Sequence, residues 1–201
     1  MQEKSATRMT GQDRRSAATR GKLITAARQA FAETGFYEAS TPAIVRAAGV
    51  SRGALYHQFE DKTALFLAVV EDMQREVYDA IEDATRDSDD PLQALKDGSR
   101  VFLELAARDD FVRIVMIDGP AVLGLGEWRR IDRENGIASL KTGLEAASAT
   151  GAIRPLPLDE LAVLLSGAMN EGVMHILDAP DRGKALDALC RTIDAMLDGL
   201  R

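Results

Sequence analysis

Apolar residues recur every three or four positions along most of the chain, which is the period of an α-helix with one buried face. No run alternates apolar and polar residues as a half-buried strand does, and no Asn-Gly or Asp-Gly turn joins two such runs. The pattern predicts an all-α fold of about nine helices. The expected helices cover approximately residues 16–34, 41–48, 51–59, 61–85, 92–106, 109–117, 127–150, 158–177 and 182–200.

Capping residues indicate where several of these helices begin and end. Gly35 is expected to end the first helix as a C-cap. Thr41 is expected to cap the second helix, with Pro42 at the first helical position, where its missing N–H costs nothing. Ser51 and Asp61 are expected to cap the third and fourth helices.

Residues 41–59 have the pattern of two short helices joined by a tight turn. The turn is Ala48-Gly49-Val50, in which the glycine permits a positive φ and the valine can fill the corner between the helices. Ser51 then restarts the chain as a helix. This is the layout of a helix-turn-helix, whose second helix enters the DNA major groove by its N-terminal residues.

The formal net charge of −7 is unevenly distributed along the chain. Residues 1–59 carry nine Lys or Arg and four Asp or Glu, a net of +5, whereas the remainder carries 16 and 28, a net of −12. The N-terminal part can therefore approach a polyanion, while the rest cannot. A basic disordered tail on an acidic protein would give the same distribution of charge.

Other patterns exclude several classes of protein. No stretch approaches the ~18 uninterrupted apolar residues of a transmembrane helix, and the polar N-terminus lacks the apolar middle of a signal peptide. The single cysteine, Cys190, rules out an internal disulfide and fits a reducing cytoplasm. His175 has no second histidine or cysteine at a metal-binding spacing. We therefore expect a cytoplasmic protein with no membrane partner, no metal and no cofactor.

The helix-turn-helix segment resembles that of the tetracycline-repressor-like (TetR) family of transcription regulators. The resemblance spans about residues 23–71. His57 and Gln58 depart from the residues that many members have there. The residues that carry the resemblance are Thr41, Ile44-Val45, Ala48-Gly49-Val50-Ser51, Gly53-Ala54-Leu55-Tyr56, Phe59, Lys62 and Leu65.

The resemblance implies a DNA-binding regulator, in particular a repressor, that binds a palindromic operator in duplex DNA as a homodimer and is nucleoid-associated when bound. Arg52 and Gly53 open the recognition helix, and an arginine there favours guanine O6 and N7. Groups at helix N-termini are suited to phosphates. The residues expected at the DNA are Thr41, Arg46, Ser51, Arg52, Gly53, Tyr56, His57 and Lys62, with Arg14, Arg15 and Arg20 as further candidates.

The resemblance also implies an unknown small-molecule effector bound among the later helices. The Gly- and Pro-containing segment 118–126, expected to be a loop or a broken helix, is a candidate entrance. Plain core packing is the alternative for the apolar candidates, and a surface amide is the alternative for Asn135. The residues expected to contact the effector are Phe102, Phe111, Met116, Trp128, Asn135 and Met169. The expected organisation is a mobile arm (1–15), a helix-turn-helix DNA-binding domain (16–61) and a ligand-binding and dimerisation domain (62–201).

The last two helices are both amphipathic, with apolar faces too wide for a small core to cover fully. Pairing with their copies around a two-fold axis would give a four-helix bundle. The residues expected at this dimer interface are Leu161, Leu165, Ala168, Gly172, Ile176, Leu186, Leu189, Ile193 and Leu197.

Two other functions remain to be weighed against a regulator. An enzyme is disfavoured because the chain has no Ser/His/Asp arrangement, no metal-ligand cluster and no phosphate-binding loop. A helical adaptor that binds protein through its first four helices is the other alternative. Charge reversal at Arg52 and Lys62 distinguishes it, because only a DNA binder must lose affinity and salt dependence.

Overall fold

The computed structural model describes residues 11–201, and this part of the chain is helical without a β-strand. The chain forms two compact units, with the boundary between Val69 and Val70. The boundary lies inside α4 (Lys62–Thr85), later than the 61/62 boundary expected from the sequence. The reason is that Leu65, Phe66 and Val69 of α4 belong to the core of the first unit.

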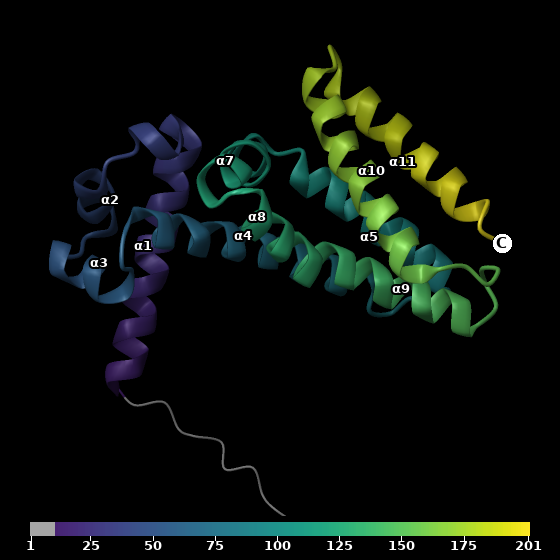
Figure 1. Cartoon of the computed structure of the whole chain (residues 1–201), viewed down its shortest axis with the longest axis horizontal. Coiled ribbons are helices and arrows are strands. Elements are labelled where there is room, and N and C mark those ends of the chain that lie inside the picture. The colour runs from purple at the N-terminus through teal and green to yellow at the C-terminus, as the bar shows by residue number, and fades with distance from the viewer. Residues whose placement is uncertain (1–10) are drawn as a thin grey trace, which may run out of the picture. The chain divides into compact units, whose positions relative to one another are not determined.

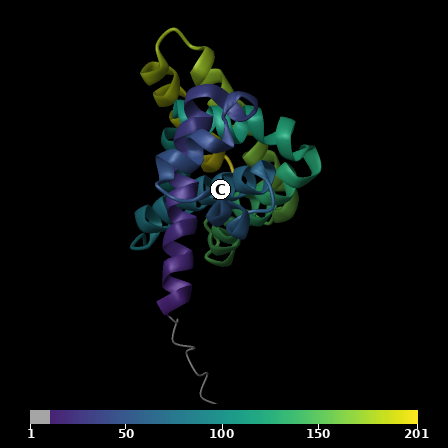
Figure 2. The same cartoon turned by 90° about the vertical axis from the view of Figure 1, so that its left-hand side faces the viewer.

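The first unit consists of α1 (Gly11–Glu38), α2 (Thr41–Ala48), α3 (Arg52–Gln58) and the start of α4. Helices α2 and α3 both pack on α1, as two views of the chain show (Figures 1 and 2). The core is centred on Phe31, Phe36 and Phe66, whose ring centroids lie 5.1–5.8 Å apart. Gly35 interrupts α1 with a φ of 79°, so the chain turns there and Phe36 is buried beside Phe31.

Two expectations about helix starts are wrong. Residues 11–15 belong to α1 rather than to an arm, because no proline or glycine follows Gly11 before Ser16 to interrupt the helix. Residues 1–10 of the expected arm lie outside the described residues. The cap of α2 is Ser40, not Thr41: the Ser40 hydroxyl accepts from the Ala43 N–H at 3.3 Å. Ser40 has the extended backbone that a cap requires, whereas Thr41 is already helical.

The second unit contains the remainder of α4 and the later helices. The expected broken helix at 118–126 is confirmed, since Gly124, with a φ of 79°, separates two short helices. The expected helices 109–117 and 127–150 include π-helical turns. The elements are α5 (Pro91–Ala106), α6 (Asp109–Phe111), η1 (Val112–Asp118), α7 (Gly119–Leu123), α8 (Leu125–Asp132), η2 (Arg133–Ile137), α9 (Ala138–Ala149), α10 (Leu158–Asp178) and α11 (Arg182–Asp198).

Helix α5 is the centre of the second unit, because α9, α10 and α11 all pack against it. Its buried Leu92 and Leu103 belong to a core that includes Leu144, Val173 and Leu197. Helices α10 and α11 lie side by side (Figure 1). None of the helices within residues 11–201 has the length and hydropathy needed to span a membrane.

Candidate nucleic-acid interface and cavity

The turn between α2 and α3 depends on a left-handed glycine. Gly49 has φ 65° and ψ 34°, a conformation that side chains with a Cβ rarely adopt. Its N–H donates to the Arg46 carbonyl and the Val50 N–H donates to the Val45 carbonyl, both at 3.2 Å. These two bonds close α2 and redirect the chain. The Ser51 hydroxyl then accepts from the Ala54 N–H at 3.1 Å and starts α3, as expected.

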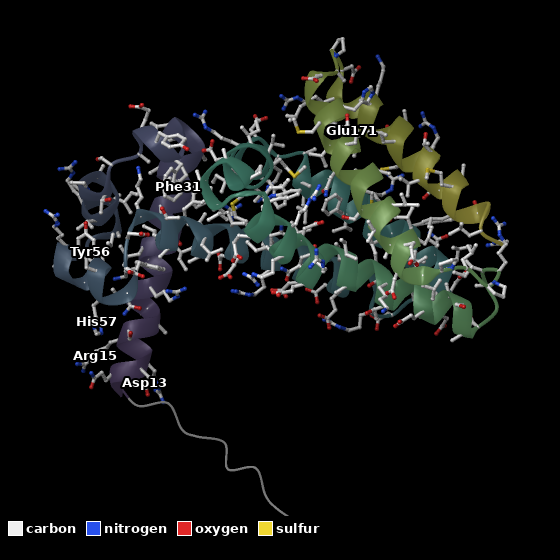
Figure 3. The ribbon with its side chains drawn as sticks, in the orientation of Figure 1. Asp13, Arg15, Phe31, Tyr56, His57 and Glu171 are labelled. Carbon is white, nitrogen blue, oxygen red and sulfur yellow. The ribbon has the colours of Figure 1, made fainter. Side chains whose placement is uncertain are left out.

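Helix α3 has one buried and one exposed face. Leu55 is fully buried and Phe59, directly after the helix, is 4% exposed. Arg52, Gly53, Tyr56 and His57 are exposed, and Tyr56 and His57 lie along the outer side of the helix (Figure 3). The Arg52 guanidinium carbon lies 5.5 Å from the centroid of the Tyr56 ring. The exposed face therefore combines a cation, an aromatic ring and an imidazole, with no carboxylate among these four residues.

Contacts with α1 fix the C-terminal end of α3. The Gln58 side-chain amide donates to the Ser16 hydroxyl at 2.7 Å. The Arg20 guanidinium stacks over the Phe59 ring at 4.4 Å. The sequence showed Gln58 only as a departure from the usual residue, and nothing in the local pattern indicated a partner 42 positions away. Arg20 is half-buried and has this structural contact, whereas Arg14 and Arg15 are exposed.

The other residues expected at the DNA differ in accessibility. Arg46 and Ser51 are exposed, and Thr41 is half-buried in the first turn of α2. Lys62 has a structural role: its ammonium donates to the carbonyl oxygens of Phe36, Tyr37 and Ala39 at 2.8, 3.3 and 3.1 Å. An ammonium has three N–H groups, so a phosphate contact would have to replace one of these bonds. The contact of Lys62 with phosphate therefore stays a prediction that this structure does not favour.

The second unit contains a partly open cavity of about 870 Å³, lined by α4, α5, α9, α10 and the segment around η2. Of the six residues expected to contact an effector, Phe102, Asn135 and Met169 line it, and their contact with an effector stays a prediction. The other three expected residues do not line it. Phe111 is 2% exposed in the core, and Met116 lies in η1.

Trp128 is the clearest of these corrections. Its indole N–H donates to the Val115 carbonyl at 2.7 Å, and its ring packs so closely on Gly119 that a Cβ there would lie 2.9 Å from the Trp128 Cδ1 atom. The polar partner of this half-buried indole is therefore a backbone group of the protein, and the side chain has a packing role.

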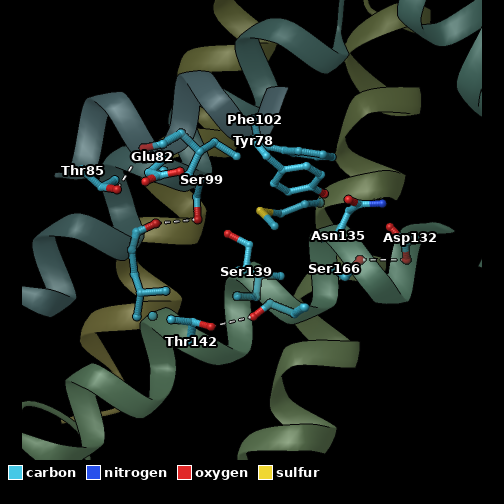
Figure 4. Close-up of a pocket in the computed structure, with 18 of the residues that line it drawn as sticks. Tyr78, Glu82, Thr85, Ser99, Phe102, Asp132, Asn135, Ser139, Thr142 and Ser166 are labelled. Carbon is cyan, nitrogen blue, oxygen red and sulfur yellow. Dashed lines mark hydrogen bonds between the residues drawn. The ribbon is translucent and has the colours of Figure 1, made fainter. Parts of the chain in front are cut away.

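Asp132, Asn135 and Ser166 lie on one side of the cavity, which we call its polar end (Figure 4). Other polar side chains line the rest of the wall, namely Glu82, Thr85, Ser99, Ser139 and Thr142. The Ser166 hydroxyl donates to Asp132 at 3.3 Å, and the Asn135 amide donates to the Ile131 carbonyl at 2.7 Å. Burial raises the pKa of Asp132, while hydrogen bonds from Ser166 and Asn170 act in the opposite direction. Burial, and then the negative charge of Asp132, raise the pKa of Tyr78. Sequence reasoning missed Tyr78 and Asp132, because their meeting depends on how α4 packs against η2.

The exposed apolar surface of α10 and α11 is not the expected one. Five of the expected interface residues are buried within the subunit, because α11 packs on α5 and α10 packs on α5, α9 and α11. These residues are Leu165, Gly172, Ile176, Ile193 and Leu197. Leu161, Leu186 and Leu189 are half-buried, and Ala168 is exposed.

A different set of apolar side chains on these two helices faces outward. Val163, Leu164 and Met196 are 54%, 70% and 47% exposed. Gly167 and Ala168 are exposed between them in sequence, and a Cβ added at Gly167 would have no neighbour within 4 Å. We call these five residues the outer apolar face.

Comparison with known proteins gives two family matches that together cover most of the chain. Residues 23–69 match the family described as bacterial regulatory proteins, tetR family, and residues 92–200 match the one described as tetracyclin repressor-like, C-terminal domain. The second match alone spans more than half of the 201 residues.

Individual relatives are transcription regulators. The HTH-type transcriptional repressor Rv1474c of Mycobacterium tuberculosis is 45% identical over 60 residues, which are 29% of this chain and only 32% of that protein. The repressor AcnR of Corynebacterium glutamicum is 28% identical over 169 residues, 80% of this chain and 89% of that protein. The crystal structure of a TetR-family regulator from Pectobacterium atrosepticum superposes with a TM-score of 0.76 at 27% identity, covering 96% of this chain and 97% of that one.

Proposed function

Because the chain belongs to the tetracycline-repressor-like family of bacterial regulatory proteins, we propose that it is a transcription repressor that binds a palindromic operator as a homodimer and responds to a small-molecule effector. The matched families and relatives are regulators rather than enzymes. The protein would act in the cytoplasm, on the DNA of the nucleoid.

The exposed face of α3 is the observation that carries the proposal. Arg52, at the first position of the helix, is free to reach into a major groove and donate to guanine O6 and N7. Gly53 has only the Ser51 hydroxyl, 3.9 Å away, near the position a Cβ would take, so the helix start can approach base edges closely. Tyr56 and His57 lie one turn later, where they can bind phosphate or base edges.

The net charge of +5 on residues 1–59 favours the same surface for DNA. Exposed Arg14, Arg15 and Arg46 would contribute phosphate contacts beside α3. Thr41 and Ser51, at or next to helix N-termini, would add weaker ones.

The outer apolar face supports the homodimer. Leu164 and Val163 expose more than half of their side chains in the isolated subunit, and Met196 of α11 exposes nearly half. Packing α10 and α11 against their copies would form a four-helix bundle and remove these side chains from water. Gly167 and Ala168 would allow the two α10 helices to approach closely.

The cavity of the second unit supports a response to an effector. An effector changes DNA affinity only if it binds the DNA-competent and the DNA-incompetent states with different affinity. Helix α4 runs from the first unit into the wall of the cavity and is the element through which such a difference would act.

Fluorescence anisotropy with the intergenic DNA next to the gene tests the proposal. Wild-type protein should bind saturably, with palindrome dependence and a strong loss of affinity as salt rises. Arg52→Glu should weaken binding by about a hundred-fold, because a bidentate base contact is lost and a repulsive charge is added. Arg86→Glu makes the same charge change on an exposed residue of the second unit and should change affinity by no more than about two-fold.

Each outcome decides between the regulator and the adaptor. An adaptor would bind no DNA at low salt, or would bind equally well with Glu at position 52. Either result would contradict the proposed function.

A further inference from the structure

The charged groups of the cavity wall are mostly carboxylates. Glu71, Glu82, Asp132 and Glu134 line the cavity, and Arg75 is the only basic residue among its lining residues. Two of the four carboxylates share one cation from outside the lining, since Arg130 forms ion pairs with Glu134, with Glu71 at 3.9 Å and also with Glu127. Arg75 in turn lies 3.5 Å from Asp72, which is not a lining residue.

Two carboxylates of the wall have no ionic partner. Among residues 11–201, neither Asp132 nor Glu82 forms an ion pair with a lysine or an arginine. Glu82 is exposed, whereas Asp132 is half-buried at the polar end. Asp132 receives hydrogen bonds only from neutral side chains, those of Ser166 and Asn170. An ionised carboxylate can accept about four hydrogen bonds, so Asp132 keeps capacity for a donor from a ligand.

The backbone at this end lets two side-chain oxygens approach it closely. Gly136 lies in the π-helix η2, and a Cβ added there would be 2.9 Å from the Tyr78 hydroxyl and 3.1 Å from an Asp132 carboxylate oxygen. Both oxygens therefore converge on one point of the wall that has no side chain. Single π-helical turns of this kind occur frequently at functional sites.

Apolar side chains in the rest of the wall, among Thr85, Ser99, Ser139 and Thr142, suit an apolar body. Leu95, Phe102, Leu140 and Met169 line the cavity, and its volume of about 870 Å³ is that of a site for a small organic molecule. Tyr78 and Phe102 each contribute an aromatic ring to the lining (Figure 4). The faces of aromatic rings attract cations, so these two rings add to the preference that Asp132 sets.

We propose that this cavity binds an amphipathic organic cation, with a protonated amine donating to Asp132 beside Tyr78 and an apolar body between Phe102, Leu140 and Met169. An anionic ligand would place its charge near Asp132 and Glu82, with Arg75 as the only basic side chain among the lining residues. A neutral alcohol could still donate a hydrogen bond to Asp132, but it would lack the charge assistance that makes such bonds stronger. That the bound cation controls DNA binding rests on the proposed function.

Three probes with one apolar body and different heads test the proposal: 4-phenylbutylamine, 4-phenylbutan-1-ol and 4-phenylbutyrate. In isothermal titration calorimetry of the full chain at pH 7, the amine should bind at least about ten-fold tighter than the alcohol. The carboxylate should bind more weakly than both. Asp132→Asn should weaken amine binding by about ten-fold and change alcohol binding by less than about two-fold. Asp83→Asn, at an exposed α4 carboxylate that does not line the cavity, is the matched control and should leave all three unchanged.

The order of the three probes with wild-type protein decides the proposal without any variant. Alcohol or carboxylate binding as tight as the amine, or no binding of any probe, overturns it. So does full amine affinity in a folded Asp132→Asn. Should that variant not fold, Gly136→Ala supplies a second one, because its methyl group would intrude between the Tyr78 hydroxyl and Asp132; retained amine affinity would overturn the site.

Anisotropy with operator DNA and no probe separates this inference from the proposed function. Selective binding of the amine without DNA binding would contradict the proposed regulator but support the proposed class of ligand. DNA binding without selective binding of the amine would contradict only the proposed class of ligand.

Discussion

Lys62 joins the end of α1 to the start of α4, and its removal should destabilise the first unit. Its ammonium donates to three carbonyl oxygens that follow the break at Gly35, and it lies 4.4 Å from the centroid of the Phe36 ring. Lys62→Met keeps most of the apolar stem while removing the charge and all three donors. The Phe36 and Ala39 carbonyls are part-buried, so they would lose their partner with incomplete access to water.

The expected loss of stability is about 2–3 kcal/mol. A hydrogen bond from a charged group contributes about 1.5–3 kcal/mol, but three bonds to one ammonium do not add, and the Tyr37 carbonyl can be hydrated. The cation–π contact contributes a further ~0.5–1 kcal/mol at a partly exposed site. The total is therefore near the upper value for a single charged hydrogen bond.

Urea unfolding followed by far-UV circular dichroism measures the effect. The matched control is Lys184→Met, because the Lys184 side chain is 87% exposed and forms one ion pair with Asp181 three residues away. Such a surface pair contributes under ~1 kcal/mol. A free energy of unfolding for Lys62→Met within about 0.5 kcal/mol of wild type would refute this account of the three bonds.

Three further predictions follow from the same structure. Leu164→Glu should raise the dimer dissociation constant, measured by sedimentation analysis, by about a hundred-fold. Leu125→Glu changes another exposed leucine, in α8, and should leave the constant unchanged. Equal effects of the two variants would exclude the outer apolar face as the interface. Asp132→Asn should melt at a higher temperature than wild type at pH 7, because the folded state holds the Asp132 proton more tightly than the unfolded state. Its advantage should shrink as the pH falls through the raised pKa of Asp132 toward the ordinary 3.8, and a pH-independent difference would contradict the burial of the charge. Gly49→Ala should lower the free energy of unfolding by about 1–2 kcal/mol, because Gly49 has a positive φ. Gly53→Ala should leave the stability unchanged and affect only DNA binding. Equal unfolding midpoints for these two variants would contradict the strained turn.

Local features of the fold could be predicted from the sequence, because they depend on neighbouring residues. The turn at Gly49, the caps at Ser51 and Asp61 and the buried Leu55 and Phe59 all follow from patterns within a few positions. The break near 118–126 followed from its glycines and proline. The start of α2 was displaced by one residue because Ser40 and Thr41 are both good caps, and only the backbone decides between them.

Features that depend on packing between helices could not be predicted in the same way. The periodicity of α10 and α11 indicated which side chains share a face, but not that α5 and α9 pack against these two helices. The outer apolar face was therefore missed, although Leu164 and Val163 stand in the same helix as the residues expected at the interface. Likewise, the need of Trp128 for a polar partner was recognised, but the sequence could not show that the Val115 carbonyl meets it.

Hydroxyl-radical footprinting on the intergenic DNA tests the central claim most directly, namely that two copies of α3 enter successive major grooves. A symmetric dimer of this kind predicts two protected patches on one face of the duplex, centred about 10–10.5 base pairs apart or a multiple of that spacing. The Arg52→Glu variant should leave both patches unprotected at the same protein concentration. A single patch, protection without two-fold symmetry, or an unchanged footprint with Arg52→Glu would contradict the claim.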